Sequence, residues 1–153
     1  MKIFNQKQLA ITLLVLLALP FVVFSFLLVA GSEVSALPIP PVMALHGYGV
    51  LVVSFFAGIQ WGVHFCKRTD DSVYLLSFAT AMLAWLSLLR PGTVIGLLVI
   101  LVTFVLSWIE ECRLSRQRVT TAWFCQVRCI STALIILSLG LAIGLVAAGR
   151  VLR

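Results

Sequence analysis

The feature that most constrains this chain is a series of five apolar stretches, each close to the length of a membrane-spanning helix. They cover residues 9–30, 44–64, 73–89, 93–109 and 127–148. A helix needs about 20 mostly apolar residues to cross a bilayer, and each stretch is apolar around its whole circumference, as a lipid-embedded helix should be. The pattern predicts an all-α polytopic membrane protein, in which residues 1–153 form a single transmembrane domain, a five-helix bundle.

The composition excludes most other classes of protein. Of the 153 residues, 62% are hydrophobic and only 10% are charged, whereas about 25% are charged in an ordinary soluble domain. The mean hydropathy of +1.17 is also far above that of a soluble globular protein. Because the five stretches leave no loop long enough to form a soluble domain, we exclude a soluble enzyme, a nucleic-acid-binding module and a disordered protein.

The net charge of +6 would suggest nucleic acid in a soluble protein, but in a membrane protein lysine and arginine gather in cytoplasmic loops and set the topology. With the N-terminus inside, the inner segments contain Lys2, Lys7, Lys67, Arg68, Arg113, Arg116, Arg118 and Arg128. The outer segments then contain Arg90, Arg150 and Arg153. This bias predicts an N-in, C-out orientation and no nucleic-acid partner.

The first stretch resembles a signal peptide in that Lys2 and Lys7 precede it. Its apolar run is about 22 residues, however, and a signal peptide has an apolar region of about 7–15. We interpret it as a retained helix with a bend at Pro20, because proline is tolerated inside membrane helices.

Stripes of small residues indicate where helices can approach closely in lipid. The second stretch has Ser54, Gly58 and Gly62 at four-residue spacing, and the third has Ser77, Ala81 and Ala84. The fifth has Gly140, Gly144 and Ala148, a GxxxG pattern extended by one step. These stripes fit packing inside one bundle; self-association through the stripe of the fifth stretch is the alternative.

The tryptophans and one amide are candidate site residues. Trp61 lies beside the glycine stripe of the second stretch, which predicts an indole packed across a helix crossing. Trp85, Trp108 and Trp123 lie near the ends of predicted spans, where an interfacial aromatic belt accounts for them. Gln60 is the most deeply placed strong hydrogen-bonding side chain, and we expect it to face protein rather than lipid.

Charged residues are absent from the middle of every predicted span, which disfavours a proton pump. Glu110 and Glu111 follow the fourth stretch, and Arg128 opens the fifth on the same side of the membrane. Two interpretations of Arg128 remain open. It pairs with one of these glutamates and pins the two helices together, or it snorkels to the cytoplasmic surface.

Neither the histidines nor the cysteines predict a cofactor or metal site. His46 and His64 lie 18 residues apart, about 27 Å along a helix, too far to ligate one haem. Cys66, Cys112, Cys125 and Cys129 contain no CxxC pair. The predicted topology places all four in a reducing compartment, where we expect free thiols rather than structural disulfides.

No catalytic motif is present, whether a phosphate-binding loop, a dinucleotide-binding glycine pattern, a zinc-protease helix or a nucleophile elbow. Five helices do not divide into two equal halves, which weakens an inverted-repeat transporter. We therefore expect no enzymatic activity and assign no catalytic residue.

Several segments resemble the domain of unknown function 3429 family (DUF3429), the integral membrane proteins like transmembrane protein 69. The segment Ser54–Gly62, SFFAGIQWG, is similar to that family's SFLGGIHWG signature. Ala84–Trp85 looks like its AW pair, Glu110 or Glu111 matches an acidic residue at the end of the fourth helix, and Trp123 with Arg128 matches its WYxxLR segment. Gln60 and Phe124 depart from the family's usual histidine and tyrosine. The resemblance covers about residues 48–138 and implies a multi-pass protein of the bacterial inner membrane whose activity is unassigned.

Three functions remain after these exclusions. The first is a structural, accessory or assembly component of a larger membrane complex, favoured by the short loops and small-residue faces. The alternative is a small-solute or lipid transporter with a pocket near Gln60 and Trp61. A membrane enzyme or redox protein comes third, because no catalytic group supports it. The lipid bilayer and other membrane subunits are the expected partners, with no cofactor.

Overall fold

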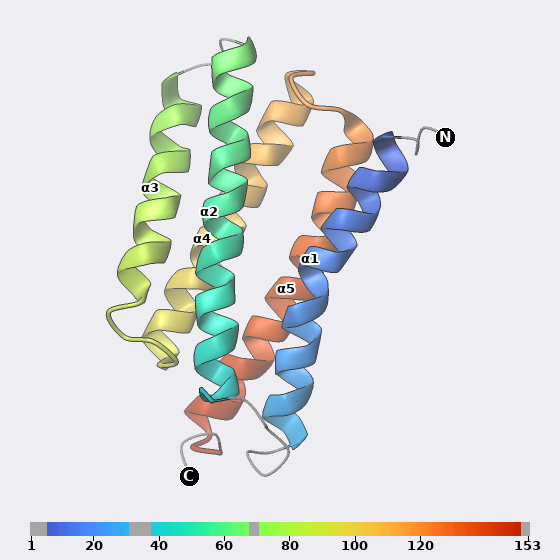
Figure 1. Ribbon diagram of the computed structural model, residues 1–153. Helices are drawn as coiled ribbons and strands as arrows, with labels where there is room; N and C mark the ends of the chain where they lie inside the picture. The colour runs from blue at the N-terminus through green and yellow to red at the C-terminus, as the bar shows by residue number, and fades with distance from the viewer. Residues whose placement is uncertain (1–5, 31–37, 68–70, 151–153) are drawn as a thin grey trace.

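The computed structural model describes residues 6–30, 38–67 and 71–150, and these residues form five α-helices (Figure 1). The helices are α1 (Gln6–Ala30), α2 (Pro41–Lys67), α3 (Asp71–Ser87), α4 (Val94–Arg116) and α5 (Ala122–Ala147). Each predicted apolar stretch coincides with one helix, so the all-α fold is confirmed for the described residues. Gly31 and most of the proline-containing loop that follows it lie outside them.

The ends of two helices differ from the prediction. α4 ends at Arg116 instead of residue 109, and α5 begins at Ala122 instead of residue 127. Hydropathy marks where a helix contacts lipid, but glutamate and arginine are good helix formers and extend it beyond that point. As a result, Glu110, Glu111 and Arg128 lie inside helices rather than at their margins.

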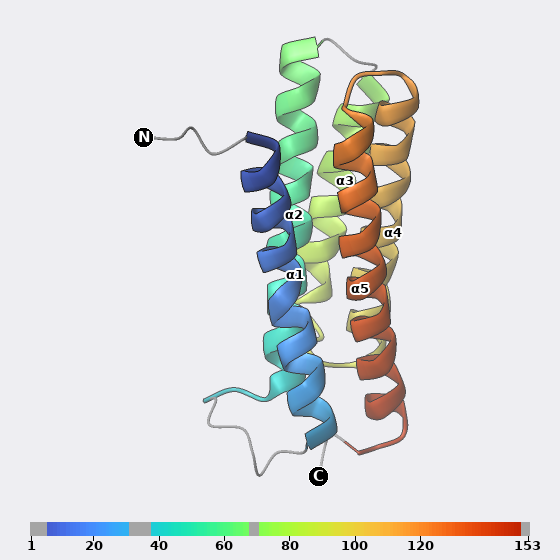
Figure 2. The ribbon, with the colours of Figure 1, turned by 90° about the vertical axis from the view of Figure 1, so that its right-hand side faces the viewer.

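The helices form an up-and-down ring in which each packs against its neighbours in the chain and α1 closes against α5 (Figures 1 and 2). α2 also contacts α4 across the ring. The start of α1 and the end of α5 lie at opposite ends of the bundle (Figure 1). Four helices are long and apolar enough to cross a membrane, whereas α3 has 17 residues, about 25 Å of helix.

An aromatic cluster fills the space between α1, α2 and α4. The ring of Phe21 meets Tyr48 edge-on at 5.2 Å and Phe104 at 5.8 Å between centroids. The Tyr48 hydroxyl donates to the carbonyl of Leu17 at 3.0 Å. Pro20 has no backbone N–H, so the carbonyl of Leu16, four residues earlier, lacks its helical donor. The Leu17 carbonyl that Tyr48 contacts is the next one along the chain. α1 continues through Pro20 as one helix.

The buried face of α2 is not its glycine stripe. His46, Gly49, Val53, Phe56 and Gln60 point inward at alternating spacings of three and four residues. A Cβ atom at Gly49 would lie 3.0 Å from Cγ2 of Ile100, so the close approach between α2 and α4 depends on this glycine.

The predicted packing through two small-residue stripes is wrong. Ser54, Gly58 and Gly62 are exposed, and so are Gly140, Gly144 and Ala148. A Cβ at any of the four glycines would have no neighbour within 4 Å. Membrane helices are apolar on every side, so small residues mark a possible contact face without showing whether it points inward. The third stripe does face the bundle, with Ser77 and Ala84 fully buried.

Candidate functional site

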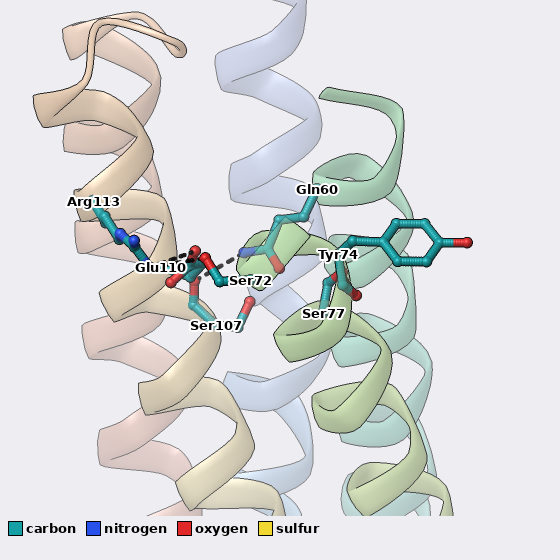
Figure 3. A network of polar contacts seen from close by, with 7 residues as sticks. All are labelled: Gln60, Ser72, Tyr74, Ser77, Ser107, Glu110 and Arg113. Atoms are coloured by element: carbon teal, nitrogen blue, oxygen red, sulfur yellow. Dashed lines mark hydrogen bonds and ion pairs between the residues drawn. The ribbon is translucent and has the colours of Figure 1, made fainter. Parts of the chain in front are cut away.

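Five polar side chains from three helices gather inside the bundle near the turn between α4 and α5. We call this cluster the polar centre; it consists of Gln60, Ser107, Glu110, Glu111 and Arg128. None is more than 3% exposed. The spacing of Ser107, Glu110 and Glu111 along α4 is one helical turn, which places them on one inward face. Gln60 extends from α2 toward this face (Figure 3).

Ser107 connects the three helices of the polar centre. Its backbone carbonyl accepts a hydrogen bond of 3.1 Å from Nε2 of Gln60 on α2. Its hydroxyl oxygen accepts one of 3.0 Å from Nη2 of Arg128 on α5. The prediction that Gln60 faces protein is confirmed, and its role is to join α2 to α4.

Arg128 points into the protein, so the snorkelling interpretation is wrong. Only 1% of the residue is exposed, and its guanidinium carbon lies 2.9 Å from the centroid of the Phe56 ring. A cation over an aromatic face is attracted by the quadrupole of the ring, whose face has a negative electrostatic potential. Glu111 is near enough to attract Arg128 electrostatically, but no ion pair joins Arg128 to either glutamate among the described residues.

Glu110 has a different cationic neighbour, which the sequence analysis missed. Nη1 of Arg113, one turn further along α4, lies 3.8 Å from Oε1 of Glu110. The same nitrogen donates to the hydroxyl of Ser72 on α3 at 3.3 Å (Figure 3). The spacing of three residues in Glu110–Arg113 is the signal that could have identified this pair.

The polar centre has unused hydrogen-bonding capacity. Among the described residues, Nη1 of Arg128 and the Oε1 atoms of Glu110 and Glu111 are buried without a hydrogen-bond partner. The hydroxyl of Thr132, on the turn after Arg128, is in the same state. Buried polar atoms are normally satisfied, so these four atoms keep hydrogen-bonding capacity that the described residues do not use. It contains donors and acceptors but no thiol or activated hydroxyl.

The other predicted site residues lie elsewhere. Trp61 stacks on Tyr74 of α3 with 4.4 Å between ring centroids, so its indole packs across a contact between two helices as predicted, although the glycine stripe beside it is exposed. Tyr74 points away from the polar network (Figure 3). Trp85 is exposed near the end of α3. Trp123 lies at the start of α5, where Nζ of Lys7 is 5.9 Å from its ring centroid.

The opposite end of the bundle has its own polar contact at His46. The amide of Gly92, in the turn between α3 and α4, donates to Nδ1 of this fully buried histidine at 3.1 Å. This leaves Nε2 to carry the ring proton, and Nε2 lies 2.7 Å from the hydroxyl of Ser87. A Cβ at Gly96 would lie 2.6 Å from Cε1 of His46. The sequence analysis did not predict these partners.

Two of the four cysteines meet across helices. Sγ of Cys112 on α4 lies 3.8 Å from Sγ of Cys125 on α5, and both residues are half-buried. Cys66 and Cys129 are exposed. All four are free thiols, and the described ranges contain no group of three or more side chains arranged to hold a metal ion.

Comparison with known proteins identifies the family. Residues 6–144 match the family model described as "Protein of unknown function (DUF3429)". Neither a curated protein nor a solved structure matches the chain. The match covers α1 through most of α5, including the polar centre and the motif at residues 54–62 on which the resemblance was based. The chain therefore belongs to the DUF3429 family of proteins of unknown function.

Proposed function

We propose that this protein crosses the bacterial inner membrane five times, with its N-terminus in the cytoplasm. Four helices have the length and hydropathy of membrane spans. α3 is the shortest, but the exposed apolar residues Leu88 and Leu89 extend its lipid-facing surface beyond its last turn. The eight basic residues in the segments predicted to lie inside, against three in those predicted to lie outside, support the orientation.

Within the membrane, the protein acts as an accessory or assembly component of a larger complex. The observation that carries this proposal is the outward position of the two glycine stripes, Ser54–Gly58–Gly62 on α2 and Gly140–Gly144–Ala148 on α5. Small side chains let another helix approach the backbone closely in lipid. The charged residues of the polar centre, by contrast, are turned inward, where they hold the protein's own helices together. No catalytic step is part of this proposal.

Purification from native membranes in mild detergent tests this role. The proposal predicts a partner, or a second copy, that co-purifies with the wild type and is lost with Gly58→Leu or Gly140→Leu. An added Cβ at either position would have no neighbour within 4 Å, so the thermal unfolding temperature should not fall. Val22→Leu, on the exposed surface of α1, is the matched control. An unchanged set of partners in both glycine variants would contradict the proposal.

A transporter of small polar solutes is the second candidate, supported by the buried atoms of Arg128, Glu110 and Glu111 that have no hydrogen-bond partner among the described residues. Ionisable side chains at membrane depth commonly mark a solute or ion pathway. Of the two residues near which a pocket was predicted, Gln60 belongs to the polar centre, whereas Trp61 packs against α3. Native mass spectrometry of the purified protein distinguishes the two functions. A bound small molecule that is lost in Glu111→Gln would favour the transporter.

A further inference from the structure

The cysteine contact between α4 and α5 involves only one pair of thiols. Cys112 lies four residues before the end of α4, and Cys125 lies in the first turn of α5. Their sulfur atoms are 3.8 Å apart. A disulfide bond is about 2.05 Å long, so a shift of less than about 2 Å would bring the sulfurs to bonding distance. Both residues are only half-buried, which leaves them accessible to a small reagent.

This thiol pair adjoins the polar centre on both helices. Cys112 directly follows Glu111, and Cys125 precedes Arg128 by three residues, which is close to one helical turn. A covalent bond between the two sulfurs would therefore fix the relative position of the helix segments that carry Glu111 and Arg128. Cys66 on α2 and the exposed Cys129 on α5 make no such sulfur contact among the described residues, although Cys129 is near enough to act on Cys112 electrostatically.

We propose that Cys112 and Cys125 are a site of reversible oxidation, at which a low-molecular-weight disulfide such as oxidised glutathione converts the two thiols into an α4–α5 disulfide. One cysteine loses its proton to water, and its thiolate attacks the small disulfide. A mixed disulfide forms, and one small thiolate leaves and takes up a proton. The second cysteine, also deprotonated, then displaces the other small thiol. In total, two protein thiols are oxidised and one small disulfide is reduced to two thiols. The proposal depends neither on the membrane orientation nor on the proposed accessory role.

Peptide mapping of the full-length protein tests the pairing. The purified protein is exposed to oxidised glutathione in detergent, its remaining thiols are blocked, and it is unfolded and digested with trypsin. Because Arg113, Arg118 and Arg128 separate the cysteines, Cys112, Cys125 and Cys129 fall in the peptides 69–113, 119–128 and 129–150. Trypsin does not cleave at Arg90 because Pro91 follows it. The proposal predicts that 69–113 becomes linked to 119–128 and is released by reduction.

Single variants provide the control. The link between 69–113 and 119–128 should form in Cys66→Ser and Cys129→Ser as it does in the wild type. It should be absent in Cys112→Ser and Cys125→Ser, where the remaining cysteine of the pair has no partner and can hold at most a mixed disulfide with glutathione. Four reactive thiols in the oxidised wild type would overturn the proposal, as would a link from 69–113 to 129–150 or a disulfide between two chains. The wild-type peptide map decides the question even if a variant fails to fold.

Discussion

Arg128 occupies a position that a charged side chain in a membrane helix can hold only with help from its neighbours. The guanidinium of Arg128 donates a hydrogen bond to the Ser107 hydroxyl, lies over the ring of Phe56 and is attracted by the charge of Glu111. The sequence predicts that Arg128 and the glutamates lie at one height, because their helices are joined by a short linker. It could not predict Ser107 as the direct partner, since that depends on how α4 and α5 are rotated about their axes.

Replacing Arg128 should be far more damaging than replacing an exposed arginine. Arg128→Ala leaves Glu111 without a nearby cation and Ser107 without its donor, and we expect the free energy of unfolding to fall by more than about 2 kcal/mol. Arg128→Lys should restore part of this loss, because an ammonium keeps the charge but not the planar guanidinium. Arg116→Ala, at an exposed position of α4, should change it by less than about 0.5 kcal/mol. Thermal unfolding in detergent measures all three.

Double-mutant cycles identify which neighbours act on Arg128. We expect coupling of about 0.5–3 kcal/mol between Arg128 and Ser107, and between Arg128 and Glu111. Coupling to Glu110 should be weaker, because the carboxylate of Glu110 lies beside Arg113. Additive effects in the Ser107 and Glu111 cycles would show that Arg128 is held by packing alone.

At the scale of the helix, hydropathy predicts where all five elements lie but not which faces pack. A soluble helix turns its apolar side inward, so its buried face can be read from the sequence, whereas lipid accepts apolar side chains on every side. Polar residues carry the missing information, because Gln60 avoids lipid and marks the inner face of α2. The glycine spacing predicted the opposite face of α2 as the packing face, and that face is exposed.

Glycines on the two faces of α2 should therefore respond differently to a larger side chain. Gly49→Leu forces a branched side chain against Ile100 and Phe104, and we expect a loss of at least about 1–3 kcal/mol from overpacking. Gly62→Leu adds the same atoms in open space and should leave the unfolding temperature unchanged or raise it, because leucine favours helix more than glycine does. Equal destabilisation by both would contradict the assigned inner face.

The start of α4 offers a parallel test with a single methyl group. Gly96→Ala places a Cβ atom 2.6 Å from the His46 ring and against the carbonyl of Arg90. We expect it to lower the unfolding free energy by about 1–3 kcal/mol. Gly140→Ala, which meets no atom within 4 Å, should be neutral or stabilising. A neutral Gly96→Ala would mean that His46 does not hold α2 against the turn between α3 and α4.

At the scale of the whole molecule, the bundle is held by polar contacts near both ends and by apolar packing between them. The polar centre joins α2, α4 and α5 near one end, and His46 joins α2 to the α3–α4 turn near the other. The aromatic cluster around Phe21 fills the space between them. α2 takes part in all three, which agrees with its central position in Figure 1. α3 connects the two ends, because Ser72 at its start contacts Arg113 near the polar centre and the turn that follows it contacts His46.

The most direct test of this account is the side of the membrane on which three turns lie. Reporters are fused after Gly92, Gln117 and Arg150 in separate proteins expressed in a bacterial inner membrane. A bundle in which all five helices cross, with the N-terminus inside, predicts that Gln117 reports the cytoplasm and that Gly92 and Arg150 report the outside. A cytoplasmic signal from Gly92 would mean that α3 does not cross the membrane, and would contradict the five-span bundle.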